Sequence, residues 1–147
     1  MPAPIHHAID ITASPVAVWR ALTDLSSWPR WFPYAASARA LEGTAFAEGS
    51  AFEVALAVPI AGTVAVRLAV RSVEPERRLV LAGRGFGVRA EHLYTVEDRG
   101  AWTRLSSHDT FAGLVVTLGA ARLRDRLDDL AHDALERLKA VVEGVPG

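Results

Sequence analysis

Apolar and polar residues alternate through the centre of the chain, and this period of two predicts β-strands. Segments 50–58 and 63–73 show the alternation most clearly, so each is expected to bury one face and to expose the other. Their apolar positions are Phe52, Val54, Leu56, Val58, Val64, Val66, Leu68 and Val70. Residues 5–11 and 77–83 are further predicted strands, and residues 87–111 are typical of a β-hairpin.

Helical signals stand at the two ends of this strand-rich region. Near the start, Ser14 is a typical N-cap for a first short helix. A second short helix is expected to begin at Asp24 and to be ended by Pro29 and Pro33. Near the end of the chain, apolar residues recur at helical spacing, which predicts a long amphipathic helix. Its apolar stripe is Leu123, Leu127, Leu130, Ala134, Leu138 and Val141.

This order of elements places the chain in the α+β class: a strand, two short helices, a run of strands and one long helix. An antiparallel sheet of about seven strands has one face that needs cover, and the terminal helix carries a matching apolar stripe. We therefore expect one domain over residues 1–147, in which a strongly curved sheet wraps around the C-terminal helix. Such packing leaves an apolar space between the sheet and the helix.

The composition narrows the classes of function. With 16 basic and 17 acidic residues, the formal net charge is −1, which gives no support for a nucleic-acid partner. The absence of cysteine excludes disulfides, thiol catalysis and cysteine-ligated metal. We find neither a signal peptide nor an apolar run long enough for stable membrane insertion. A cytoplasmic protein, monomeric or homodimeric, is therefore expected.

Residues 28–33, "WPRWFP", concentrate aromatic side chains, although aromatic residues make up only 7% of the chain. Trp28 is expected to anchor the second short helix in the core. Trp31 and Phe32 follow the helix breaker Pro29, where regular packing should end. These two rings are therefore candidates for the rim of the apolar space.

Three segments carry a resemblance to a known group of proteins: "ITASPVAVWRALTDLSSWPRWFP" (11–33), "VEPERRLVL" (73–81) and "EHLYTVEDRGAWTRLSSHDTFAG" (91–113). Over nearly its full length the chain resembles the SRPBCC superfamily of helix-grip proteins, which includes START, polyketide cyclase/dehydrase and Bet v 1-like members. The first segment also resembles the opening of single-domain bacterial aromatase/cyclases. The resemblance implies a helix-grip fold with a deep hydrophobic cavity for lipids, polyketide intermediates or other apolar small molecules. It implies no catalytic residues, because the superfamily mixes enzymes, carriers, sensors and co-chaperone domains.

The hairpin carries the best candidates for chemistry. Residues 99–100 are expected to form a two-residue turn. In that register His92 lies opposite Ser107, and Asp109 is diagonally adjacent. His92, Tyr94, Ser107 and Asp109 fall on the more apolar face of the hairpin, and we assign this face to the cavity.

A carboxylate beside an imidazole favours the charged imidazole, whereas burial opposes it. His92 and Asp109 are therefore candidates for general acid–base catalysis on a bound carbonyl or hydroxyl group. Tyr94 and Ser107 would orient the substrate, with Tyr94 donating a hydrogen bond to an enolate-like oxygen. The same residues also fit ligand contact without chemistry, or a cluster that only satisfies its own hydrogen bonds. A nucleophilic role for Ser107 is disfavoured, because the sequence shows neither a strained elbow nor an oxyanion hole.

Three functional hypotheses remain open. The first is an enzyme of the cyclase or dehydratase type that acts on a polyketide-like substrate, without a cofactor and without a metal because the histidines are scattered. The second is a non-enzymatic carrier or sensor for a lipid or aromatic metabolite, and the third is a protein-interaction module. The residues expected to contact the ligand are Trp31, Phe32, Phe52, Val54, Val66, Leu68, Phe86, Tyr94, Leu105, Ser107, Phe111, Leu123 and Leu127.

Overall fold

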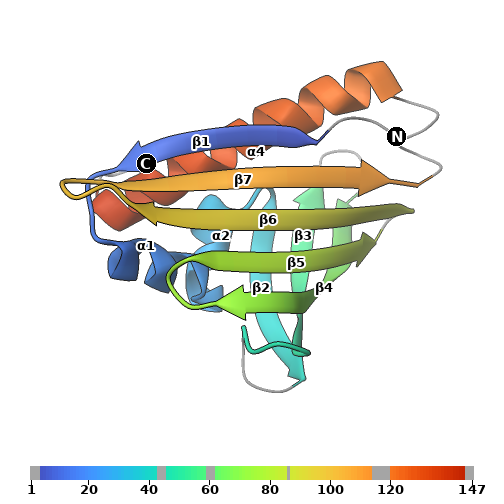
Figure 1. Cartoon of the computed structure of the whole chain (residues 1–147). Helices are drawn as coiled ribbons and strands as arrows, with labels where there is room; N and C mark the ends of the chain where they lie inside the picture. The colour runs from blue at the N-terminus through green and yellow to red at the C-terminus, as the bar shows by residue number, and fades with distance from the viewer. Residues whose placement is uncertain (1–3, 43–45, 59–61, 86, 114–119, 145–147) are drawn as a thin grey trace.

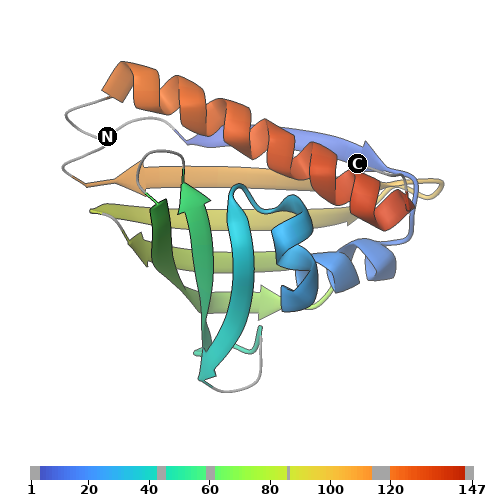
Figure 2. The ribbon, with the colours of Figure 1, turned by 180° about the vertical axis from the view of Figure 1, so that it is seen from behind.

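The chain folds into one antiparallel sheet with helices on its concave side (Figures 1 and 2). The computed structural model describes residues 4–42, 46–58, 62–85, 87–113 and 120–144. Its elements are β1 (Ile5–Ile11), α1 (Pro15–Leu22), the 3₁₀ helix η1 (Leu25–Ser27), α2 (Trp28–Trp31), β2 (Ala35–Glu42), β3 (Ala51–Val58), β4 (Gly62–Glu74), β5 (Arg78–Gly85), β6 (Val88–Asp98), β7 (Thr103–Ala112) and α4 (Ala120–Glu143).

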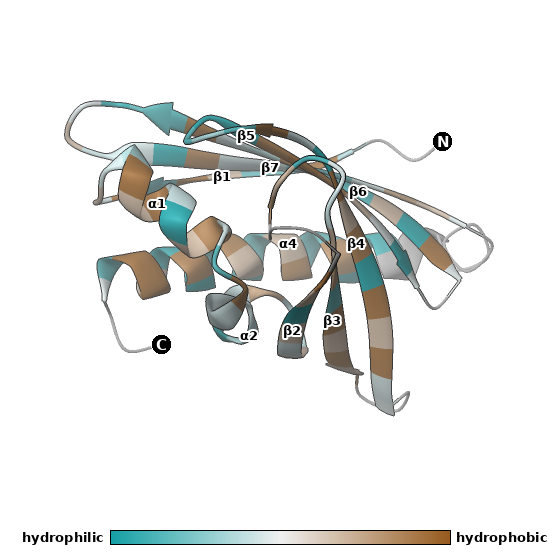
Figure 3. Ribbon diagram, turned by 90° about the horizontal axis from the view of Figure 1, so that it is seen from below, coloured by the Kyte–Doolittle hydropathy of each residue, from teal (hydrophilic) through white to brown (hydrophobic). Residues whose placement is uncertain are grey.

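The seven strands follow the order β1-β7-β6-β5-β4-β3-β2, and every neighbouring pair is antiparallel. Figure 2 shows α4 running across the concave face, with β2, β3 and β4 curving round beside it. In Figure 3, α1 and α2 lie on the same side of the sheet as α4. The predicted α+β helix-grip arrangement, with two short helices after the first strand, is confirmed.

The alternation along the strands separates the two faces of the sheet. In β4, Leu68 and Val70 are 1% and 2% exposed, whereas Arg67 and Arg71 on the opposite face are exposed. Figure 3 shows the same change from apolar to polar residues along the strands. Burial of this apolar face is the main driving force for wrapping the sheet around α4.

The C-terminal helix α4 is amphipathic and is anchored on the edge strand β1. On its buried side, Leu135 and Leu138 are 1% and 0% exposed. Lys139 Nζ donates a hydrogen bond of 2.7 Å to the carbonyl oxygen of Asp10 in β1. Among the described residues, no helix combines the length and the apolar character needed to cross a membrane.

The N-terminal helices begin where the sequence predicts, but the second predicted helix continues beyond its expected end. The Ser14 hydroxyl accepts a hydrogen bond from a backbone N–H of α1, and the Asp24 carboxylate does the same for η1. Pro29, however, lies in the first turn of α2 instead of ending a helix. Proline is tolerated there because the first N–H groups of a helix have no partner within the helix. The helix continues to Trp31, so the expected stop at Pro29 is wrong.

Trp28 lies at the centre of an aromatic cluster that fills one end of the concave face. Its side chain is fully buried, and Nε1–H donates a hydrogen bond of 3.1 Å to the carbonyl oxygen of Leu22. The rings packed against it are those of Trp31, Phe32, Phe46 and Phe52, with centroids 4.7–6.0 Å away. This cluster ties α1, α2 and the sheet together, which agrees with the anchoring role expected of Trp28.

The loop between β6 and β7 is longer than expected. Asp98 pairs with Thr103, so residues 99–102 form the loop in place of a two-residue turn. The N–H of Arg99 donates a hydrogen bond of 2.9 Å to the carbonyl oxygen of Trp102. The carboxylate of Asp98 also accepts a hydrogen bond of 2.9 Å from a backbone N–H inside the loop. These local hydrogen bonds stabilise the longer connection.

This longer loop makes the predicted hairpin register wrong by two residues. His92 lies directly opposite Asp109, and Ser107 is opposite Tyr94. Because the shift is an even number, every residue of the hairpin keeps its predicted face. The correction brings His92 and Asp109 closer together than the sequence predicted.

The aromatic cluster generates a prediction about stability. Trp28→Ala should lower the free energy of unfolding by about 3–5 kcal/mol, because it removes a large buried ring and leaves a cavity. Trp102→Ala is a matched control: Trp102 is 42% exposed and should change stability by about 0.5 kcal/mol or less. Urea unfolding followed by circular dichroism measures both. Equal losses for the two variants would contradict the anchoring role of Trp28.

A pair of stacked histidines across β1 and β7 generates a prediction about pH. The rings of His6 and His108 lie 4.1 Å apart. Burial lowers the pKa of His108 below its ordinary value of 6.5, and His6 lowers it further, whereas Asp109 partly opposes this. The unfolded chain therefore binds a proton more readily than the folded chain, so stability should fall as the pH drops below about 6.5.

His108→Asn should reduce this loss, because it removes the group that resists protonation in the folded state. The free energy of unfolding, measured in urea at pH 7, 6 and 5, should fall less steeply for the variant than for the parent chain. An identical decline in both proteins would contradict the assignment.

Candidate functional site

A cavity of about 560 Å³ lies between the central strands of the sheet and α4. This volume falls within the range of small-molecule binding sites, about 300–1,000 Å³. Most of the wall is apolar: α4 contributes Leu127, Leu130, Ala131, Ala134 and Leu135, and the strands contribute residues such as Leu56, Val64 and Val88. The cavity is therefore suited to a ligand with a substantial apolar body.

Nine of the residues that the sequence analysis proposed for catalysis or ligand contact line this cavity. They are Phe32, Val66, Leu68, His92, Tyr94, Ser107, Asp109, Phe111 and Leu127. Apart from Phe32 and Leu127 they all lie on β4, β6 and β7, with side chains on the concave face. The alternation of apolar and polar residues predicted the position of these strand residues, because it shows which side chains share one face of a strand.

Four other candidates are packed in the core away from the cavity wall: Trp31, Phe52, Val54 and Leu105. Each is no more than 1% exposed. Trp31 and Phe52 belong to the aromatic cluster around Trp28, which closes one end of the concave face. They were included because the alternation identifies the inner face of the sheet without locating the cavity along it; their contact with a ligand stays a prediction. Trp31 ends α2 and is fully buried, so it does not form a rim.

Two further candidates fall outside what the structure describes. Phe86 lies between the described segments that end at Gly85 and resume at Gly87. Leu123 belongs to α4, but its side chain is not among those described. Their contact with a ligand stays a prediction.

His92 and Asp109 form a hydrogen-bonded pair on the cavity wall. His92 Nδ1 lies 2.7 Å from Asp109 Oδ1, and their side chains are 12% and 7% exposed. The strands β6 and β7 position the two residues as a directly opposed pair, so no loop movement is needed to bring them together. Three rings surround the imidazole: those of Phe32, Tyr94 and Phe111, with centroids 6.0–6.4 Å away.

This pairing orients the imidazole for proton transfer. An ionised carboxylate can only accept, so Nδ1 must carry the hydrogen that is shared with Asp109. Nε2, on the other side of the ring of His92, then holds a lone pair. Among the described residues it has no hydrogen-bond partner. The pair therefore presents a potential proton acceptor to the cavity, with a carboxylate placed to stabilise the imidazolium that would form.

Tyr94 and Ser107, which face each other across β6 and β7, add two hydroxyl groups to the same wall. Burial raises the pKa of Tyr94 well above its ordinary value of 10, and the nearby Asp109 adds to the rise. The phenol therefore stays protonated and can donate a hydrogen bond. Ser107 Oγ is buried and has no hydrogen-bond partner among the described residues.

Sequence reasoning missed two polar residues on the cavity wall, Tyr34 and Arg126. Tyr34 belongs to a segment with no clear alternation. Arg126 lies next to the apolar stripe of α4, four residues before Leu130, and this helical spacing was the available signal.

The remaining histidines lie outside the cavity wall. His7 Nε2 lies 3.0 Å from Asp128 Oδ1 in α4, and His132 pairs with Glu136 at 3.4 Å. Across the described ranges, no three histidine or acidic side chains are arranged to hold a metal ion.

The curved sheet, the long C-terminal helix and the cavity between them define a helix-grip protein. The profile of the family described as "Polyketide cyclase / dehydrase and lipid transport" matches residues 3–143, and the chain belongs to this family. The resemblance to the SRPBCC superfamily is thereby confirmed.

Solved structures share this fold over nearly the whole chain. Protein CV1439 from Chromobacterium violaceum is 20% identical, with a TM-score of 0.75 over 99% of this chain and 100% of that chain. TTHA0849 from Thermus thermophilus is 15% identical, with a TM-score of 0.79 over 98% and 99%. Ara h 8.0201 is 13% identical, with a TM-score of 0.78 over 96% and 97%. At these identities the likeness shows the fold alone, and no curated protein matches the sequence.

The unpartnered hydroxyl of Ser107 generates a prediction. Ser107→Ala should leave the free energy of unfolding unchanged or raise it by up to about 1 kcal/mol, because a desolvated hydroxyl without a partner contributes no stability. Thr103→Val is the matched control on the same strand: the Thr103 hydroxyl donates a hydrogen bond of 2.6 Å to the carbonyl oxygen of Ala13. Its removal should cost about 1–3 kcal/mol. Equal destabilisation by both substitutions would contradict the assignment of Ser107 as unpartnered.

Proposed function

We propose that the protein binds an apolar small molecule with a carbonyl group in this cavity, and that His92 and Asp109 act on it as an acid–base pair. The main support is the 2.7 Å hydrogen bond between these two side chains on the wall of an otherwise apolar cavity. The description of the family, which includes cyclase and dehydrase activity, agrees with this chemistry. The substrate class is polyketide-like, with carbonyl groups along an apolar body.

Proton transfer would begin with attack by Nε2 of His92 on a C–H group next to the bound carbonyl. The C–H bond breaks, the proton moves to Nε2, and the electron pair passes into an enolate. Asp109 stabilises the imidazolium that results. The protonated hydroxyl of Tyr94 donates to the enolate oxygen, and Ser107 orients the ligand. Return of the proton at another atom would complete an isomerisation, a dehydration or the closing step of a cyclisation.

Deuterium exchange tests this chemistry without knowledge of the natural substrate. 2-Acetylnaphthalene is an apolar ketone whose methyl protons exchange slowly with solvent in the absence of a base. The protein should speed this exchange in D₂O, as measured by NMR, and His92→Gln should lower the acceleration about 100-fold or more, the usual contribution of a general base. Binding of the neutral fluorescent probe N-phenyl-1-naphthylamine should change less than about tenfold, or 1.4 kcal/mol.

His108→Gln is the matched control, because His108 lies on the same strand as Asp109 but on the opposite face. The H108Q variant should catalyse exchange of the methyl protons of the ketone at the same rate as the parent chain. If the parent chain binds the neutral probe but leaves the exchange rate unchanged, the acid–base proposal fails, and a non-enzymatic carrier or sensor becomes the better description.

A further inference from the structure

Arginines gather on the convex face of the sheet, on the other side of the strands that line the cavity. Leu68 faces the cavity, so its neighbour Arg67 in β4 faces outward. Arg67 is directly opposite Arg84 of β5, and Arg84 is directly opposite Arg89 of β6. Arg71 adds a fourth arginine to the same face of β4, and all four residues are exposed. These four arginines are the arginine cluster.

Fold stability does not account for the arginine cluster. Adjacent strands are about 4.8 Å apart, so Arg67, Arg84 and Arg89 place three like charges within a span of about 10 Å. Like charges directly opposite each other on one face of a sheet are destabilising. Among the described residues, Arg71, Arg84 and Arg89 have no ion-pair partner. An external anion would relieve this repulsion.

Two glutamates on the same face balance the charge only in part. Glu53 is opposite Arg67 in the register and also opposite Arg39, whose Nη2 lies 3.2 Å from the Glu53 carboxylate. Glu91 follows Arg89 by two residues on the same face of β6. The arginines therefore outnumber the carboxylates on this part of the surface, although the whole chain has a formal net charge of −1.

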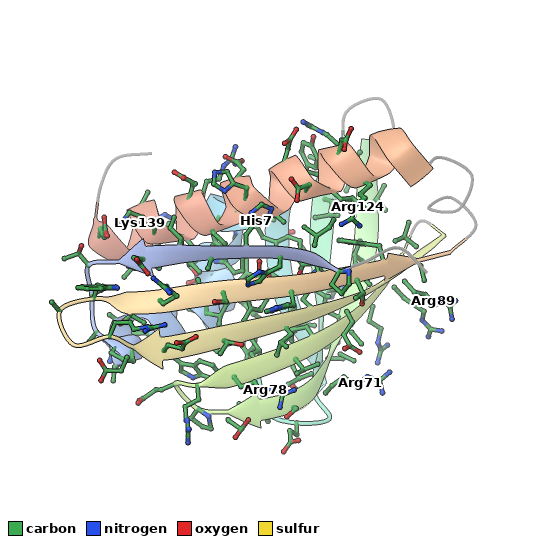
Figure 4. The ribbon with its side chains drawn as sticks, turned by 45° about the horizontal axis from the view of Figure 1, so that its top comes forward. His7, Arg71, Arg78, Arg89, Arg124 and Lys139 are labelled. Atoms are coloured by element: carbon green, nitrogen blue, oxygen red, sulfur yellow. The ribbon has the colours of Figure 1, made fainter. Side chains whose placement is uncertain are left out.

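Small side chains surround the arginine cluster. The nearest residues on the same face of the sheet are alanines: Ala65, Ala69, Ala82 and Ala112. The long arginine side chains therefore project beyond their neighbours. In Figure 4, Arg71 and Arg89 extend from the strands on the side away from α4. A large partner that approaches this face would meet guanidinium groups first.

The shape and composition of this surface favour one kind of anionic partner. Guanidinium groups pair well with phosphate, which both lipids and nucleic acids carry. A convex surface can reach few phosphates of a rigid duplex, whereas lipid headgroups move laterally and can gather around it. The outward positions of the described strands β4, β5 and β6 also carry no aromatic ring on which a base could stack. A lipid surface is therefore the better match.

We propose that the arginine cluster docks the protein reversibly on a bilayer that contains anionic phospholipids. Basic residues close to an anionic leaflet each strengthen such binding about fivefold. The cavity lies on the other face of the same strands, so docking would hold it close to a phase in which apolar molecules concentrate. Only this last point rests on the proposed function. The docking itself requires neither a ligand in the cavity nor chemistry at His92.

Sedimentation with vesicles tests the docking. One set of vesicles contains only phosphatidylcholine, and the other contains phosphatidylcholine and phosphatidylglycerol in equal amounts. In low salt the parent chain should bind the anionic vesicles at least about tenfold more tightly than the neutral ones. High salt should reduce this preference, because exposed charges are screened. The net charge of −1 would not by itself draw the chain to an anionic surface.

The double variant R84Q/R89Q should bind the anionic vesicles about 30-fold more weakly, the combined effect of two arginines. R20Q/R30Q is the matched control: it removes the same charge from exposed arginines of α1 and α2, which lie on the concave side of the sheet. This control should bind nearly as well as the parent chain. R84Q/R89Q should also be at least as stable as the parent chain in urea, because it relieves repulsion between directly opposed charges.

Three results would overturn the proposal. The first is an absence of preference for the anionic vesicles in the parent chain. The second is an equal loss of binding in the two double variants, which would attribute the effect to net charge. The third is binding of poly-L-glutamate or of a DNA duplex without binding of the anionic vesicles, which would indicate an acidic protein or a nucleic acid as the partner. Any of these leaves the proposed function of the cavity standing.

Discussion

The apolar concave face of the sheet must be shielded from water. An aromatic cluster and helix α4 cover it together, and the way in which they do so creates the cavity. The aromatic cluster around Trp28 fills one end of this face. Helix α4 covers the remainder, but its backbone approaches β1, α1 and α2 more closely than the central strands. Hydrogen bonds from Lys139 to Asp10 and from Thr12 to Glu143 hold the helix at the β1 edge. The space left between α4 and the central strands is the cavity.

The polar groups on the cavity wall would be costly if they served only the fold. A buried polar atom without a partner destabilises the native state, so buried groups are usually bonded. His92 and Asp109 satisfy each other, but Nε2 of His92 and Oγ of Ser107 have no partner among the described residues. In the proposed function, Nε2 of His92 is the atom that a bound ligand would engage.

Much of the fold could be predicted from the sequence because it depends on short-range periodicity. The alternation in β4 and the helical spacing in α4 identify which faces are apolar, and both were located correctly. The hairpin register was missed because hydrogen bonds inside the loop at 99–102 determine its length. Even so, His92 and Asp109 were placed on the correct face, since an error of two residues preserves it.

The candidate site was harder to predict than the fold. Trp31 and Phe32 are neighbours in sequence, yet one is fully buried in the core and the other lines the cavity. The difference arises from the direction in which α2 packs, which no local pattern encodes. Leu56, Val88 and Leu130 are far apart in sequence, and only the curvature of the sheet brings them to one cavity wall.

The central claim is that an apolar ligand occupies the cavity beside the acid–base pair. Intermolecular nuclear Overhauser effects between protons of N-phenyl-1-naphthylamine and protein side chains test it most directly. The account predicts contacts to the methyl groups of Ala90, Ala131 and Ala134 and to the ring of His92, all of which line the cavity. Contacts confined to the exposed apolar residues Val16 and Trp102, with none to the cavity wall, would contradict it.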